Sequence, residues 1–406
     1  MALLQPFRAL RPTPASAARV AAVPYDVINA EEARALAAGN PLSFLHVSRS
    51  EIDLPPDTDS HSPMVYQSAA ANFARLRAQA PFVQEDEPSL YVYRLRLGSH
   101  EQTGVAGCYS LDEYDRNLVK KHERTRPDKE NDRTTHLLAL GAQTGPVFLT
   151  YKASQAVDVV AGRTIMVRKP LFDFLASDDV THTIWPVATE DIAELVDAFA
   201  QVPALYIADG HHRAASAARA RESATSAGRG HGPWDAFLAV AFPGNQTQVL
   251  AYHRVIRDLG THTPETLMAA IGAHHTVKAG GSVPERPGDV CVYLAGAWYT
   301  VTIGPAAVGD SESAQLDVSR LQDAVLGPIL GIGDVRTDPR IDFVGGARGT
   351  SELERLVDSG SAAVAFSMYA VGIDQLMRIS DEGGIMPPKS TWFEPKLRDG
   401  LLSHLI

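Results

Sequence analysis

The chain has 406 residues, and 45% of them are hydrophobic, which is enough apolar material for one large core or two medium ones. Its 37 lysines and arginines are outnumbered by 48 acidic residues, giving a formal net charge of −11. This balance argues against a protein that coats duplex DNA, because such proteins carry a basic stripe. A single basic pocket for a nucleotide is compatible with it.

The compartment and the redox chemistry follow from a few features of the sequence. Two cysteines, Cys108 and Cys291, are too few for a disulfide framework or a four-thiolate zinc site. Residues 1–14 alternate apolar side chains with arginines and lack the apolar run of a signal peptide. No stretch approaches the roughly 18 apolar residues of a membrane span. We therefore expect a cytoplasmic protein that does not contact a membrane.

Residues 1–260 are expected to form one region of mixed α/β structure. A turn at 24–26 follows a strand, a helix is predicted over 30–38, and 43–47 is expected to lie near a strand. An acidic, proline-bearing loop at 51–64 precedes a strand at 89–97. The remaining predictions are strands over 145–150, 202–207, 236–241 and 247–255, a helix over 214–220, and an exposed glycine-rich connection at 223–233.

From about residue 264 a second alternation begins, which predicts a separate α/β module over 261–406. Helices are expected over 264–271 and 318–325, and strands over 290–295, 298–303, 341–344 and 362–368. The overall fold class is therefore α+β or mixed α/β, with the border near 259–263.

The stretch Ala208-Asp209-Gly210-His211-His212-Arg213 is the most informative in the chain. An apolar run precedes it and an alanine-rich run follows, the order of strand, tight turn and helix. Such a turn directs backbone N–H groups and the positive end of a helix dipole at one place, which suits a phosphate. Gly210 allows close approach, and His211, His212 and Arg213 add donors. Asp209 either takes part in catalysis with His212 or only caps the helix. Adjacent histidines diverge, so no metal site is expected from them.

The run from Lys120 to Arg133 is the densest in charge. Phosphoryl transfer needs cations on the moving group and a carboxylate that takes the proton of the attacking hydroxyl. Glu123 is the candidate base, and the candidate phosphate-binding cations are Lys121, Arg126, Lys129 and Arg133. The alternative is a solvated, salt-bridged surface, although Pro127 argues against one continuous helix.

Polar residues near both ends are candidates for the substrate site. Those near the N-terminus are Tyr25, Asp26 and His46, and those near the C-terminus are Lys389, Ser390, Thr391 and Lys396. Pro387 and Pro388 force an extended backbone before Trp392 and Phe393. The C-terminal block is expected to fold back over the site; the alternative is an aromatic tail that seals the core.

The Asp-Gly-His-His-Arg sequence at 209–213 resembles the phosphate-binding box of the ParB/sulfiredoxin superfamily, and within it the free-serine kinases. His211 stands where sulfiredoxins have their reactive cysteine, so thiol chemistry is not expected. The whole chain resembles the domain of unknown function 1015 family. The blocks that carry this resemblance are 7–12, 23–28, 40–41, 43–47, 121–123 and 386–396.

The resemblance implies a ParB/sulfiredoxin-like core and a phosphotransferase that acts on free serine or phosphoserine in either direction. ATP or ADP with Mg²⁺ is the implied cofactor, and no oligomeric state is indicated. Kinases of the superfamily take their catalytic glutamate from a different place in the chain order than Glu123. The alternatives are a ParB-like nucleotide switch or DNA-associated regulator, which the acidic balance disfavours, and a non-catalytic sensor of phosphorylated metabolites.

Overall fold

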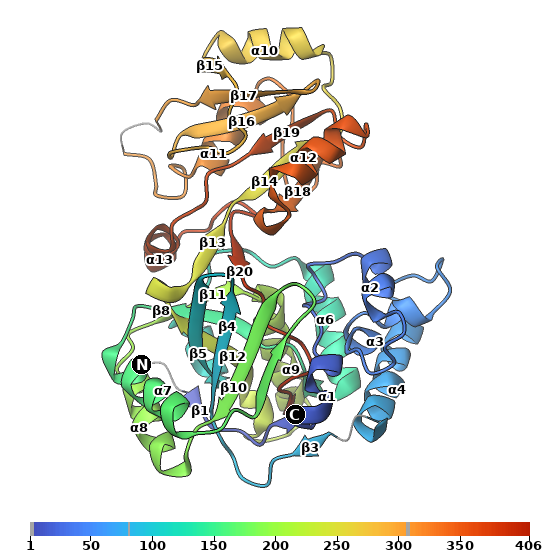
Figure 1. Ribbon diagram of the computed structural model, residues 1–406, viewed down its shortest axis with the longest axis vertical. Helices are drawn as coiled ribbons and strands as arrows, with labels where there is room; N and C mark the ends of the chain where they lie inside the picture. Colours follow the sequence, from blue (N-terminus) through green and yellow to red (C-terminus); the bar gives the residue numbers. More distant parts are fainter. Residues whose placement is uncertain (1–3, 80–81, 306–308) are drawn as a thin grey trace. The chain divides into compact units, whose positions relative to one another are not determined.

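A computed structural model describes residues 4–79, 82–305 and 309–406 and divides into two compact units (Figure 1). The first unit comprises Met1–Lys121, Thr125–Thr247 and Pro395–Ile406, and the second comprises His122–Arg124 and Gln248–Glu394. Among the described residues, no helix combines the length and apolar character needed to cross a membrane.

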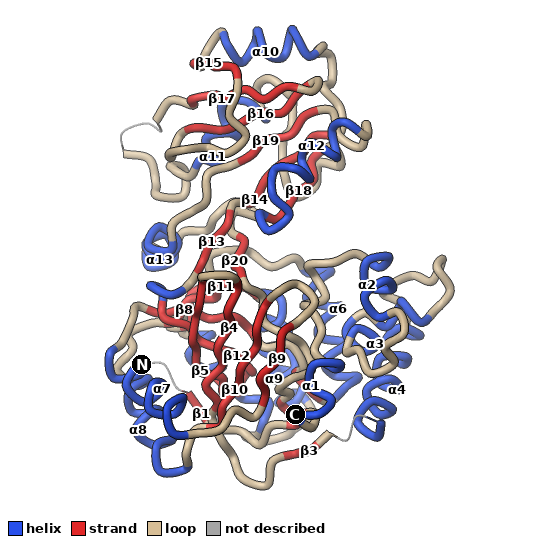
Figure 2. The backbone as a smooth tube through the Cα atoms, in the orientation of Figure 1, coloured by secondary structure: helices blue, strands red, loops and turns tan. Residues whose placement is uncertain are grey.

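The first unit is built on a mixed sheet, to which the described residues contribute nine strands (Figure 2). Most neighbours are antiparallel, but β12 runs parallel to β8 and β11 parallel to β6. In sheet order, with β1 pairing to β5 beside this path, the strands are β6 (Val119–Lys120), β11 (Leu205–Asp209), β8 (Val147–Tyr151), β12 (Ala236–Pro243), β5 (His100–Ser110), β4 (Tyr91–Leu97), β10 (Val180–Pro186), β9 (Phe172–Leu175) and β1 (Leu4–Gln5).

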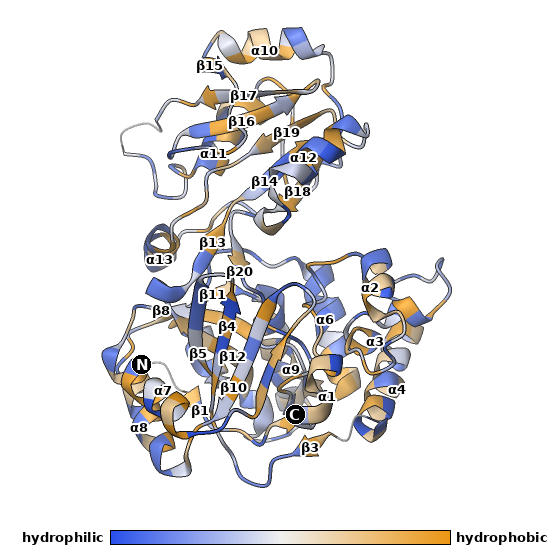
Figure 3. Cartoon of the chain, in the orientation of Figure 1, coloured by the Kyte–Doolittle hydropathy of each residue, from blue (hydrophilic) through white to orange (hydrophobic). Residues whose placement is uncertain are grey.

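The core of the first unit lies against this sheet. Every residue of β12 is buried, as the continuous apolar run predicts for a central strand. Helices α7 (Gln155–Val167) and α8 (Thr189–Ala200) contribute Val160 and Phe199 to the core, and α9 (His211–Ser226) contributes alanines (Figure 3). α9 extends into the stretch expected to be an exposed connection.

A second, smaller core lies among helices of the N-terminal segment and α6. Residues 43–47 pack beside strand residues, as expected: Phe44, Leu45 and Val47 share one apolar cluster with Leu10 and Ala142, which lie in strands. Leu45–Ser48 itself forms the short helix α3. Pro127 begins α6, where its fixed φ fits and its missing N–H is not needed. The helices of this layer are α1 (Pro14–Val20), α2 (Ala30–Ala37), α4 (Pro63–Gln79) and α6 (Pro127–Leu140). The short helix α5 (Leu111–Asp115) contributes Leu111 to the core of the large sheet instead.

The last twelve residues, Pro395–Ile406, are threaded through the first unit and are largely buried. The backbones of Asp399 and Ala22 exchange hydrogen bonds, and Gly400 N donates to Thr144 O at 2.9 Å. Further along, β21 (His404–Leu405) pairs with β7 (Ala142–Gln143). β2 (Leu10–Arg11) pairs with β3 (Val83–Gln84). The C-terminal segment therefore joins elements that are far apart in the sequence.

The second unit contains a six-stranded sheet of described residues and a two-stranded ribbon. The segment expected to be one strand over 247–255 forms two, because β13 and β14 join different sheets on either side of Ala251. The sheet order is β15 (Thr276–Ala279), β17 (Ala297–Thr302), β16 (Asp289–Leu294), β19 (Val364–Ser367), β14 (Tyr252–Ile256) and β18 (Ile341–Gly345), and the ribbon pairs β13 (Gln248–Leu250) with β20 (Trp392–Glu394). The helices are α10 (Pro264–Gly272), α11 (Asp317–Leu321), α12 (Gly349–Asp358) and α13 (Ile373–Asp381).

If the C-terminal segment stabilises the first unit, Leu402→Ala should lower the free energy of unfolding by about 2–5 kcal/mol, since Leu402 is 2% exposed and its removal leaves a cavity. Leu36→Ala, at a position 50% exposed on α2, is the matched control and should change it by about 0.5 kcal/mol or less. Hydrogen exchange of the β5 and β12 amides reports on this unit alone. Equal exchange rates in both variants would show that the C-terminal segment does not stabilise the first unit.

Candidate functional site

The 209–213 turn joins β11 to α9 in the way the sequence predicted. Gly210 has φ 93°, and a Cβ built there would lie 2.9 Å from the Arg213 guanidinium. Only glycine avoids both the strained backbone and the contact. α9 continues for 16 residues, so its first turn presents aligned N–H groups at the end of the sheet.

The Arg213 side chain lies inside the first unit and is only 12% exposed. Its Nη1 donates to Pro146 O, and its Nη2 lies 3.7 Å from Asp209 Oδ2. Its Nε is buried and has no hydrogen-bond partner among the described residues. One N–H of this guanidinium is therefore available to a ligand.

Lys396 reaches the same carboxylate from the C-terminal segment. Its Nζ lies 3.1 Å from Asp209 Oδ2, and its side chain is 10% exposed. Asp209 therefore balances two cations, Arg213 and Lys396. This contact brings a residue of the predicted substrate set to the predicted phosphate turn.

Arg133 and Tyr25 lie on another wall. The Arg133 guanidinium lies 4.1 Å from the centroid of the Tyr25 ring and 2.7 Å from Asp132 Oδ2. Tyr66 donates to the other oxygen of Asp132 at 2.8 Å. Burial is the main cause of the raised pKa of Tyr25, so its hydroxyl remains a proton donor at neutral pH. The neighbouring Asp26 side chain is exposed.

These groups surround a cavity that encloses about 520 Å³ of space, its open mouth included. Polar and apolar side chains share its walls. The lining residues are Tyr25, Ser48, Arg133, His136, Leu137, Ala142, Gln143, Thr144, Gly145, Val147, Arg213, Ser216, Leu238 and Asp399. The cavity lies wholly within the first unit.

Asp399 is a charged member of this cavity that was not among the predicted site residues. It is 4% exposed, and its Oδ1 has no hydrogen-bond partner among the described residues. Burial raises its pKa to about 7, against the opposing influence of Arg213. A Cβ at Gly145 would lie 2.5 Å from Asp399 Oδ1, so this glycine leaves room for the carboxyl group. The only signal was Asp-Gly within an apolar C-terminal stretch.

Within the charged run 120–133, Arg133 lines the cavity, and the other predicted cations lie outside its lining. Arg126 forms a surface ion pair with Asp128, while its backbone N–H donates to His212 Nε2 at 3.1 Å. Lys121 Nζ lies 3.7 Å from the centroid of the Tyr114 ring. Lys129 lies in the first turn of α6. The backbone of the run therefore supports the phosphate turn, and one of its predicted cations lines the cavity.

In the second unit, the Lys-His-Glu block lies beside the C-terminal block. His122 O accepts a hydrogen bond from Met386 N at 2.8 Å, and His122 Nε2 lies 3.4 Å from Thr391 Oγ1. Ser390 donates to Pro387 O at 2.6 Å. Lys389 Nζ lies 5.4 Å from the centroid of the Tyr252 ring. These contacts group the predicted base Glu123, which follows His122, with the predicted substrate residues of the C-terminal block.

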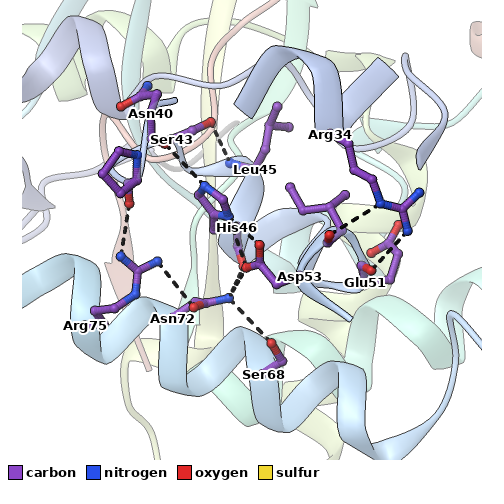
Figure 4. Close-up of polar contacts among 12 residues, drawn as sticks. Arg34, Asn40, Ser43, Leu45, His46, Glu51, Asp53, Ser68, Asn72 and Arg75 are labelled. Atoms are coloured by element: carbon purple, nitrogen blue, oxygen red, sulfur yellow. Dashed lines mark hydrogen bonds and ion pairs between the residues drawn. The ribbon is translucent and has the colours of Figure 1, made fainter. Parts of the chain in front are cut away.

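His46 belongs to a separate polar cluster (Figure 4). Its Nδ1 lies 2.8 Å from Asp53 Oδ1 and its Nε2 lies 3.2 Å from Asn40 O, while Asn72 donates to Asp53 Oδ2. These contacts tie α3 to α4, and His46 is not among the residues that line the cavity. His46 therefore lies apart from this cavity and lines a separate pocket with Asn40 and Asp53.

Comparison with known proteins identifies a family. The family model described as "Protein of unknown function (DUF1015)" matches residues 4–319. No curated protein matches the chain.

Solved structures show remote likenesses. A conserved hypothetical protein from Pyrococcus furiosus is 14% identical, with a TM-score of 0.35, over 74% of this chain and 95% of that one. A free serine kinase in complex with AMP is 12% identical, with a TM-score of 0.35, over 73% and 92%. SbnI with a C-terminal truncation, from Staphylococcus aureus, is 11% identical, with a TM-score of 0.37, over 72% and 85%.

The raised pKa of Asp399 makes a prediction about stability. Below the ordinary carboxyl pKa of about 4, Asp399 is protonated in both the folded and the unfolded chain. The stability that the folded chain owes to the neutral carboxyl group is then fully present. It is lost as pH rises towards the folded pKa of about 7, because only the unfolded chain ionises freely. The Asp399→Asn variant cannot ionise at this position. The difference in free energy of unfolding, variant minus wild type, should therefore increase by up to about 4 kcal/mol between pH 4 and pH 8. Urea unfolding across this range measures the difference, and a constant difference would contradict the assignment.

Proposed function

We propose that this chain, which belongs to the DUF1015 family of proteins of unknown function, is a nucleotide-dependent phosphotransferase whose acceptor or donor is serine or phosphoserine. The observation that carries the proposal is the pair of enclosed guanidinium groups, Arg133 and Arg213, on one cavity beside the first turn of α9. Helix N-terminal N–H groups and guanidinium forks are the donors that phosphate oxygens prefer.

The phosphate would lie against Gly210, where a side chain would block the approach. The Arg213 guanidinium lies at this turn, and the imidazoles of His211 and His212 begin α9 at the same place. The proposed core is that of the ParB/sulfiredoxin-like proteins, because the strand, the turn and the Asp-Gly-His-His-Arg sequence occur together here.

The enclosure of the cations favours a small molecule over a nucleic acid. The Arg133 and Arg213 side chains are 14% and 12% exposed, and both lie in a cavity. Phosphates of a rigid duplex cannot enter such a space, whereas a small phosphorylated group can approach these cations. The net charge of −11 points the same way.

For the chemical step, Glu123 is our proposed base. A glutamate that accepts the hydroxyl proton of serine as the phosphoryl group moves is sufficient when cations neutralise that group. Mg²⁺ would arrive with ATP or ADP, held by phosphate oxygens and water. Asp209 already balances Lys396 and Arg213, so we assign it to charge balance rather than to the metal.

Arg213→Ala should weaken the binding of AMP or ADP by about 1.5–3 kcal/mol, the usual contribution of a hydrogen bond to a charged group. Arg219→Ala, on the same helix and paired with Glu130, is the matched control and should bind normally. Calorimetry measures both affinities. If the two variants bind alike while remaining folded, Arg213 does not contact the nucleotide.

Glu123→Gln should preserve nucleotide binding but slow serine-dependent nucleotide consumption by roughly 10²–10⁴-fold, the range expected for loss of a general base. The matched control is Glu222→Gln, an exposed position on α9. Normal turnover by Glu123→Gln would remove this residue from the mechanism. Binding without turnover in the wild type would instead favour a non-catalytic sensor.

A further inference from the structure

The cavity of the first unit contains two unmatched hydrogen-bonding groups of opposite type. Arg213 Nε offers a proton, Asp399 Oδ1 accepts one, and neither has a partner among the described residues. Both residues line the cavity, and Asp399 is 4% exposed. Buried polar groups without partners are costly, so such a pair indicates a ligand that carries an acceptor and a donor.

The charges around the cavity indicate that the ligand's hydrogen-bond donor is a cation. Four cationic side chains and four carboxylates besides Asp399 lie at or next to the cavity, and contacts pair most of them. They are Arg133, Arg213, Lys396 and Arg398, and Asp26, Asp132, Asp178 and Asp209. An ionised Asp399 therefore adds one negative charge that these residues do not balance. A ligand cation would balance it, and a neutral hydroxyl would not.

We propose that Asp399 binds the primary ammonium group of an α-amino acid, with an oxygen of the same ligand on the Nε–H of Arg213. This assignment rests on the proposed function for the choice of serine, and it adds the group that selects an amino acid over a hydroxy acid. Gly145 contributes by leaving the space that the Asp399 carboxyl group occupies. Asp399 is thus a specificity-determining residue for the ligand.

A measurable consequence is proton release. The pKa of Asp399 is raised to about 7, so its carboxyl group is protonated at pH 6 when no ligand is bound. Binding of an ammonium group favours the ionised carboxylate, which then loses its proton. Serine binding should then release roughly one proton at pH 6 and almost none at pH 8. The charged and titratable groups that face Asp399 are Arg213, Arg133, Arg398 and Asp26, with Tyr25 and His136 on the cavity wall.

The test uses calorimetry on the full chain at pH 6, in two buffers of different ionisation enthalpy. L-serine is compared with L-glycerate, which has the same configuration and carries a hydroxyl in place of the ammonium. The wild type should prefer serine by about 10- to 100-fold and release a proton with it. Asp399→Asn should lose both the preference and the release, while Asp173→Asn, an exposed acid on β9, should retain both.

Proton release by the wild type tests the assignment even if Asp399→Asn fails to fold. Serine that binds without releasing a proton, serine that fails to bind at about 10 mM, or a preference that survives Asp399→Asn would each overturn it. Nucleotide consumption is measured separately. If serine binds with proton release but no nucleotide is consumed, the proposed phosphotransfer fails and the ammonium site stands.

Discussion

The first unit depends on neutralising charges that it encloses. Taking a guanidinium, an ammonium or a carboxylate out of water costs several kcal/mol for each ion, and only close partners offset that cost. Asp209 forms ion pairs with Lys396 and Arg213, Asp132 pairs with Arg133, and Asp178 pairs with Arg398. The Lys396–Asp209 pair joins the C-terminal segment to the end of β11, and the Arg398–Asp178 pair joins it to the loop between β9 and β10. A site made of such pairs is positioned before any ligand arrives, which lowers the entropy lost on binding.

The strand-turn-helix at 205–226 could be predicted because its information is local. Apolar residues, a glycine and an alanine-rich run follow one another, and each favours the same structure. The helix α3 within residues 45–48 could not be predicted, because apolar spacing over so few positions fits a strand or a short helix, and contact with Phe73 and the rest of the helical layer favours the helix. Long-range packing was the missing information there.

Asp399 could not be predicted for the same reason. Its closeness to Gly145 and Arg213 arises from the pairing of β21 with β7 and from the backbone bonds to Ala22, none of which leaves a pattern in the neighbouring sequence. Lys396 carried a clearer signal, because it closes a block with two adjacent prolines and the aromatic pair Trp392 and Phe393.

The return of the chain to its first unit also bears on how the protein matures. The chain leaves this unit after Thr247 and comes back at Pro395, so the second unit is made in between. During synthesis the β-sheet can pair long before Lys396 and Asp399 exist, yet the cavity wall remains unfinished until they do. A ribosome that stalls within the second unit would release a product with a formed sheet and an incomplete site. Synthesis of Pro395–Ile406 therefore completes the cavity wall, and a chain that stops before this segment lacks Lys396 and Asp399.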